Sequence, residues 1–134
     1  MRERMKKGKK GIVYFALATV ILFSAAVITY AASCTFTWNN YTVRGTLVST
    51  GSHAAKASTE ITNISAPAAY KVRALINAKQ SKDGSGGILK QNYEDLYNTA
   101  TVTVYHKKAH SFVSMHNIQN RGTVVKSNSL TIAD

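Results

Sequence analysis

Four histidines are the side chains of this chain that could bind a metal ion or transfer protons near neutral pH: His53, His106, His110 and His116. In one extended strand His110 and His116 would share a face, but at roughly 3.3 Å per residue they would lie about 20 Å apart, too far to bind one ion. A tight turn after His106 would let His106 and His110 approach only diagonally. The sequence has no HExxH or CxxC spacing. We therefore expect partly exposed strand histidines and no metal site.

Acid and base catalysis needs positioned carboxylates or a histidine with an orienting partner. Five carboxylates follow residue 33, and Glu94 and Asp95 are the one adjacent pair among them. The glycine-rich segment 83–87 is similar to a phosphate-binding loop, but no Lys-Ser or Lys-Thr pair follows it. The sequence thus predicts no catalytic residues and no cofactor, and indicates a protein that is not an enzyme.

The first 33 residues have the pattern of an export signal. Six cations come first, and residues 11–30 then carry no charge. The small residues Ala31, Ala32 and Ser33 follow. The six cations are Arg2, Arg4, Lys6, Lys7, Lys9 and Lys10. We expect a signal peptide over residues 1–33, and a single β domain over residues 34–134 that is secreted or held on the extracellular face of the membrane.

Three outcomes are open for this segment. Signal peptidase reads small residues one and three positions before its cut, which permits cleavage after Ala31 or after Ser33. The apolar run of about 20 residues is also long enough to remain as a membrane anchor. Cys34, the only cysteine, directly follows the small residues, and this resembles a bacterial lipobox with Ala31 where an aliphatic residue is usual. Without lipidation, Cys34 would act as a small apolar residue at the start of the first strand.

The charge of the predicted domain points to anionic partners. After residue 33 the chain has eleven Lys and Arg residues against five Asp and Glu, a net charge of about +6. These cations are scattered singly, without the runs typical of nucleic-acid-binding arms. Lys107 and Lys108 form the one adjacent basic pair, and we expect them to contact an anionic surface. The predicted partners are anionic envelope polymers, a membrane surface or another protein, and not nucleic acid; the oligomeric state stays open.

Apolar and polar residues alternate with a period of two along most of the predicted domain, as in strands with one buried face. Alternating segments cover residues 34–38, 41–48, 55–62, 70–79, 99–106, 112–118 and 123–132. Asn39 and Asn40 predict a bend, and residues 81–87 a loop. Residues 88–97 are ambiguous: Leu89, Tyr93 and Leu96 have helical spacing, and the segment could equally be a covering loop. Six or seven short strands predict an all-β fold, a small antiparallel sandwich or barrel.

Residues 105–113 contain Tyr105, His106, His110, Ser111 and Val113 in a pattern that resembles small secreted bacteriocins of the lactococcin type. The resemblance covers nine residues; its spacing is one residue short, and the Gly-aromatic ending of that family is absent. It implies a secreted β-sandwich with antimicrobial action. The function that the residues themselves favour is a basic exported protein of a Gram-positive-type bacterium that binds the envelope or a partner. The alternatives are a bacteriocin-like antimicrobial and an accessory subunit of an extracellular assembly.

Overall fold

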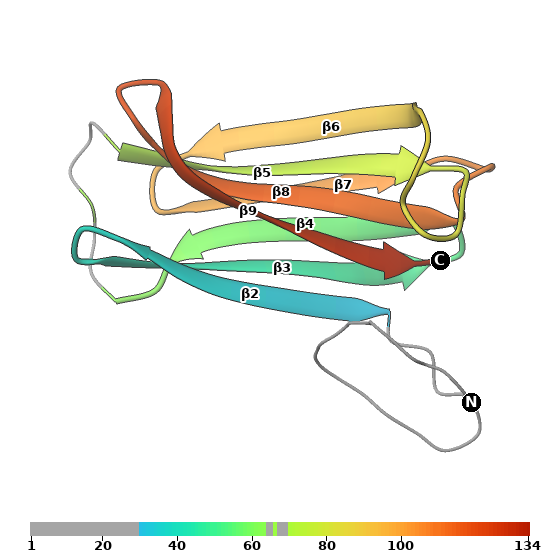
Figure 1. Ribbon diagram of the computed structural model, residues 1–134, viewed down its shortest axis with the longest axis horizontal. Coiled ribbons are helices and arrows are strands. Elements are labelled where there is room, and N and C mark those ends of the chain that lie inside the picture. Colours follow the sequence, from blue (N-terminus) through green and yellow to red (C-terminus); the bar gives the residue numbers. More distant parts are fainter. Residues whose placement is uncertain (1–29, 64–65, 67–69) are drawn as a thin grey trace, which may run out of the picture.

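A computed structural model describes residues 30–63, 66 and 70–134, and this part of the chain is all β (Figure 1). The expected signal and anchor segment up to residue 29 lies outside the described residues. No helix of the described part is long and apolar enough to cross a membrane. The strands are β2 (Ala31–Trp38), β3 (Tyr41–Gly51), β4 (Ala54–Ile61), β5 (Tyr70–Lys79), β6 (Ile88–Leu96), β7 (Thr99–Tyr105), β8 (Ser111–Asn120) and β9 (Thr123–Ala133).

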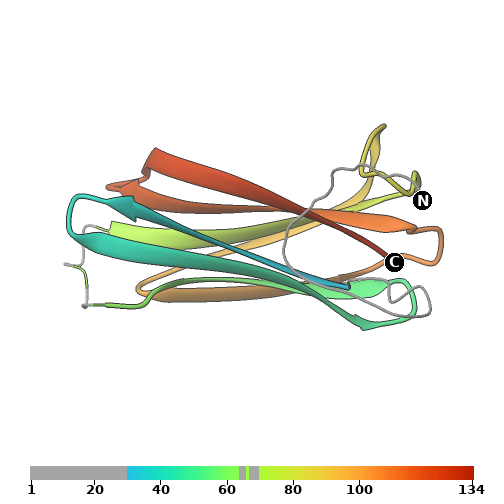
Figure 2. The ribbon, with the colours of Figure 1, turned by 60° about the horizontal axis from the view of Figure 1, so that its bottom comes forward.

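The strands form two antiparallel sheets that lie face to face (Figure 2). One sheet has the order β2-β3-β4-β7 and the other β6-β5-β8-β9. The predicted antiparallel sandwich is confirmed, with eight strands in the described residues in place of the six or seven expected. β2 lies over β9 at one side of the sandwich, and β7 lies over β6 at the other.

The core between the sheets is built from the inward residues of each strand. On β5, Val72, Ala74 and Ile76 are fully buried, and each pairs with an inward residue of β8. Alanines fill many of the other inward positions, which leaves space for larger side chains on the facing sheet. The period-of-two alternation in the sequence therefore identified the buried face of β5 correctly.

The helix or covering loop considered for residues 88–97 is wrong, because these residues form the edge strand β6 along β5. Tyr93 is 57% exposed and Leu96 45% exposed, so their helical spacing does not mark one buried face. The backbone of the strand pairs with β5 along its length, and Gln91 Nε2 also donates a hydrogen bond to Asn77 Oδ1 at 2.7 Å. An edge strand that buries few side chains leaves no clear alternation in its sequence.

Tight turns join most neighbouring strands. Asn39, Asn98 and Arg121 have left-handed backbone conformations, with φ of 53°, 66° and 50°. Asparagine adopts this conformation more readily than most residues, which fits two of the three positions. The predicted bend at Asn39 and Asn40 is confirmed, and the predicted loop lies between β5 and β6.

Candidate functional site

Lys107 and Lys108 lie in the turn between β7 and β8, at one end of the sandwich. The β3–β4 turn, the β5–β6 loop and the C-terminus lie at the same end (Figures 1 and 2). The His106 backbone N–H donates to the carbonyl of His53 at 3.1 Å, which joins two of these turns. Within the turn, the Lys108 N–H donates to His106 Nδ1 at 3.1 Å. Both lysine side chains are exposed, so their ammonium groups are free to meet a ligand in solvent.

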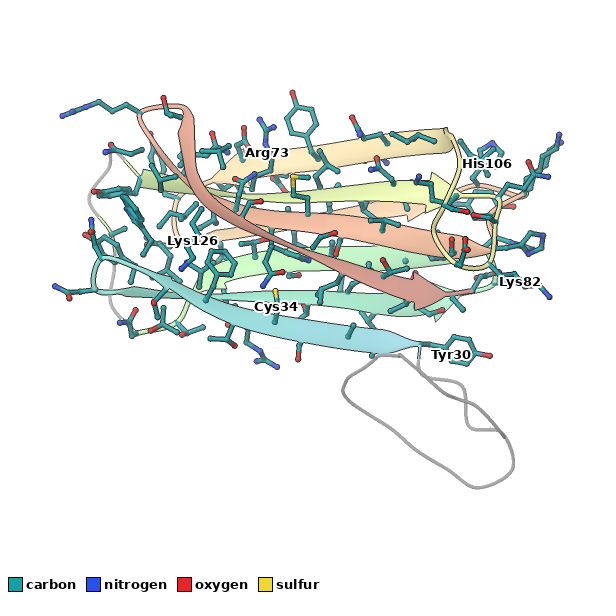
Figure 3. The ribbon with its side chains drawn as sticks, in the orientation of Figure 1. Tyr30, Cys34, Arg73, Lys82, His106 and Lys126 are labelled. Atoms are coloured by element: carbon teal, nitrogen blue, oxygen red, sulfur yellow. The ribbon has the colours of Figure 1, made fainter. Side chains whose placement is uncertain are left out.

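More lysines gather around this turn, although they are far apart in the sequence. Lys82 lies in the β5–β6 loop, at the same end of the sandwich as His106 in Figure 3. Lys79 ends β5 and donates to the carbonyl of Gly86 at 2.6 Å. Lys56 lies near the start of β4, and Lys90 lies near the start of β6. We call this group the basic end: Lys56, Lys79, Lys82, Lys90, Lys107 and Lys108.

The carboxylate of Asp134 lies at the same end, but it is already bound. Asp134 Oδ1 accepts the His53 backbone N–H at 2.8 Å, and Oδ2 lies 3.1 Å from His53 Nδ1. His53 Nδ1 also lies 2.8 Å from the Ala109 carbonyl. The Asp134 N–H in turn donates to the carbonyl of His110 at 3.0 Å. These contacts hold the end of the chain against two turns and direct this negative charge at His53.

The expectation of partly exposed strand histidines is wrong: His53, His106 and His110 lie between strands, and His116 lies in β8 but is fully buried. His53 and His110 come together, with ring centroids 6.1 Å apart. Sequence reasoning did not pair them, because they are distant along the chain and lie in different turns. Across the described residues, no group of three or more histidine, cysteine or carboxylate side chains is arranged to hold a metal ion.

His116 lies in the centre of the sandwich, fully buried on β8. Its Nδ1 is 2.8 Å from Thr59 Oγ1, and its Nε2 is 2.6 Å from Ser114 Oγ. The Thr59 hydroxyl donates its proton to the Arg73 carbonyl at 2.8 Å, so it accepts from His116 Nδ1–H. Nε2 then accepts from the Ser114 hydroxyl. This chain of hydrogen bonds satisfies a neutral imidazole.

The environment of His116 favours the neutral ring. Burial lowers its pKa from 6.5 to about 4, and a hydrogen bond with the Ser58 backbone offsets only part of this effect. Ser114 and His116 have the contact of a nucleophile and its base, but both are fully buried. The partner on Nδ1 is a threonine hydroxyl, which supplies no negative charge to stabilise an imidazolium. The arrangement therefore organises the core and offers no surface to a substrate.

A second polar cluster lies on the outer face of the β6-β5-β8-β9 sheet, around Arg73 (Figure 3). Arg73 Nε and Nη2 donate to the two oxygens of Asp95 at 2.6 and 2.8 Å. Gln119 Nε2 donates to Asp95 Oδ1 at 3.3 Å. The guanidinium lies 4.5 Å from the ring centroid of Tyr93. The hydrogen bond to Arg73 lowers the pKa of Asp95, so the pair stays ionised and holds three strands together.

The residues predicted at the signal cleavage site lie in β2. Ala31, Ala32 and Ser33 pair with Val48, Leu47 and Thr46 of β3. Cys34 comes next on β2, half-buried and on the inward face, opposite Gly45. Burial raises the pKa of its thiol. β2 thus includes Ala31 and Ser33, which a signal peptidase would read for a cut after Ser33, and Cys34, which a lipid-transferring enzyme would modify. Thr29, which is read together with Ala31 for a cut after Ala31, lies outside the described residues.

Comparison with protein-family models, curated proteins and solved structures finds no match for this chain.

Proposed function

We propose that this chain is an exported, non-enzymatic protein whose β-sandwich binds anionic polymers of the cell envelope through its basic end. The observation that carries the proposal is the gathering of six lysines from five separate segments at one end of the sandwich. The proposed export rests on the cations and the apolar run before residue 31.

The charge balance at the basic end supports an anionic ligand. Asp83 and Asp134 are the carboxylates of the described turns at this end, and Asp134 is paired with His53. Asp83 accepts the Ser85 N–H at 2.9 Å, and hydrogen bonds from Ser85 lower its pKa. The lysines therefore outnumber the carboxylates and create a field that attracts polyanions.

The geometry favours a polymer over a compact ligand. The lysines of the basic end lie in turns, near strand starts and at the end of β5; Lys79 is half-buried and the other five are exposed. Lysine binds phosphate as a point charge, without the fixed fork of arginine. A repeating phosphate chain matches such a spread of separate ammonium groups better than one small anion does.

Salt dependence tests this proposal. The full-length chain, dispersed in a mild non-ionic detergent, is titrated with purified poly(glycerol phosphate) and, separately, with dextran as an uncharged polymer. Exposed charges are screened over about 10 Å at 0.1 M salt and about 3 Å at 1 M. Binding to the polyphosphate should fall steeply between about 0.05 and 0.5 M salt. Binding that is unchanged by salt, or equal for dextran, contradicts the proposal.

A further inference from the structure

The four edge strands of the sandwich differ in how they are protected against pairing with other chains. An edge strand exposes unpaired backbone N–H and C=O groups, and proteins usually block it with charges, bulges or covering side chains. On β6, Lys90, Glu94 and Asp95 supply charges, and the pairing with β5 has a bulge. The pairing of β9 has a bulge at Ile118 and Gln119, and β9 carries Lys126.

A side chain of β6 protects the free edge of β7 against pairing with another chain. Asn92 of β6 donates from Nδ2 to the carbonyl of Thr103 on β7 at 2.8 Å. This bond occupies a backbone acceptor of β7, which is a terminal strand of its sheet.

β2 has none of these protections. Its sequence, Ala-Ala-Ser-Cys-Thr-Phe-Thr-Trp, has no charge and no proline. It pairs with β3 over its full length without a register shift. It is the outer strand of its sheet, and Figure 1 shows its outer side away from the other described strands. Ala32, Cys34 and Trp38 pack against the core but are only partly buried, because no strand covers them on that side.

The register identifies which backbone groups are free. The Ser49 N–H donates to the Tyr30 carbonyl at 2.7 Å, so Tyr30 and every second residue after it bond to β3. The alternate residues Ala31, Ser33, Thr35 and Thr37 direct their N–H and C=O groups to the open side.

We propose that β2 is a dimerisation edge, where β2 of a second copy of this chain pairs antiparallel about a two-fold axis. An uncharged strand meets its own copy without repulsion, and outward Ser and Thr side chains make favourable cross-strand pairs. In the full-length chain, pairing that aligns Ala31 with Thr37 of the copy, and Ser33 with Thr35, joins all the free backbone groups of these four residues. This pairing also keeps inward residues opposite inward residues. A chain cut after Ala31 keeps the two Ser33–Thr35 pairs.

This register places Cys34 opposite Cys34 of the copy, at a non-hydrogen-bonded position. Cα atoms of such a pair lie about 4.5 Å apart, within the range that a disulfide spans. A disulfide between the two Cys34 residues would therefore indicate this register. Because the pairing is two-fold and uses the same edge twice, it closes as a dimer and leaves the three protected edges outermost.

The proposed dimer does not depend on the proposed function, but it determines where the two basic ends lie. β2 starts at the basic end and runs away from it (Figure 1). Antiparallel pairing therefore places the two basic ends at opposite ends of the dimer. Such a dimer would join two polyanion chains, while charge reversal at the basic end would leave the dimer intact.

Sedimentation velocity of the full-length chain in mild detergent, over a range of protein concentrations, tests the dimer. Thr35→Pro removes one free-edge N–H and is tolerated at an edge position, whereas Thr35→Val keeps the N–H and is the matched control. We expect a concentration-dependent dimer for the wild type and Thr35→Val, and a monomer for Thr35→Pro. A wild-type monomer at every concentration, or a dimer that survives Thr35→Pro, overturns the proposal.

Two measurements on the unmodified strand keep the test independent of whether Thr35→Pro folds. Amide hydrogen exchange at Ser33, Thr35 and Thr37 should slow as the protein concentration rises, and unchanged exchange contradicts the pairing. Diamide, which accepts the two electrons and two protons released by two thiols, should join the Cys34 residues of the dimer in a disulfide. A dimer that gives no Cys34 cross-link contradicts the register.

Discussion

The imidazole of His116 on β8 occupies the space that a side chain at Gly45 on β3 would need. A Cβ atom at Gly45 would clash with His116 Cγ, well inside van der Waals contact. The close approach of His116 to Gly45 thus lies between the two sheets, at the centre of the sandwich.

We predict that Gly45→Ala destabilises the fold by about 1–3 kcal/mol or more, because the overpacked ring must move out of its hydrogen bonds. Urea unfolding of the full-length chain measures the change. The double variant Gly45→Ala, His116→Ala should recover part of this loss, since the new methyl group then enters space left by the ring. Additive losses in the double variant would show that the two residues do not compete for space.

The free energy of unfolding should decrease as the pH is lowered, before the carboxylates become protonated. The folded-state pKa of His116 is about 4, below its ordinary value of 6.5. At pH 7 the His116 imidazole is mainly neutral in both the folded and the unfolded chain. Below pH 6.5 this imidazole gains a proton in the unfolded chain but not in the folded chain. The resulting loss builds up between pH 6.5 and about 4 and reaches about 3 kcal/mol. Unfolding free energies of the wild type and His116→Gln should converge over this range; parallel curves would contradict the buried neutral histidine.

The Arg73–Asp95 pair should contribute modestly to stability. Its side chains are 30% and 25% exposed, so solvent screens the charges, but the contact has two hydrogen bonds. We predict that Asp95→Asn costs about 1 kcal/mol. Glu94→Gln, next on the same strand and without an ion pair to Arg73, is the control and should cost less. Equal losses of unfolding free energy for the two variants, measured by thermal or urea unfolding, would contradict a stabilising role of the Arg73–Asp95 pair.

The pairing of β2 leads us to predict signal cleavage after Ala31 in preference to Ser33. A cut after Ala31 leaves Ala32 and Ser33 paired with β3, while a cut after Ser33 removes them. Mass spectrometry of the protein produced in a bacterial host, recovered from the medium and from the membrane fraction, identifies the N-terminus. A chain that begins with a diacylglycerol-modified Cys34 would establish the lipoprotein instead, and a full-length chain in the membrane would establish the anchor.

Alternation in the sequence predicted the strands that bury one face, such as β5 with Val72 and Ile76. It did not predict β6, whose Tyr93 and Leu96 are exposed and which pairs along the edge of β5. The basic pair Lys107 and Lys108 was visible as adjacent residues. The lysines around it were not, because only the strand order brings their separate turns together.

The buried network shows a different limit. His116 alternates with Ser114 and Ile118 on the inward face of β8 and is fully buried, whereas the sequence led us to expect a partly exposed histidine. Its partner Thr59 lies on the other sheet, and Gly45 gives it room only because β3 faces β8 there. Contacts across the sandwich depend on how the sheets stack, which the alternation along one strand does not contain.

Charge reversal at each end of the sandwich in turn decides whether the basic end binds the polyanion. Lys107→Glu with Lys108→Glu changes the basic end, while Arg121→Glu with Lys126→Glu makes the same change in net charge near the opposite end, where β9 begins. Dissociation constants for poly(glycerol phosphate) are measured at one low salt concentration, with urea unfolding to confirm equal stability. We predict a much larger loss of affinity for the Lys107 and Lys108 variant than for the Arg121 and Lys126 variant. Equal losses would show that net charge alone drives binding and would contradict a binding site at the basic end.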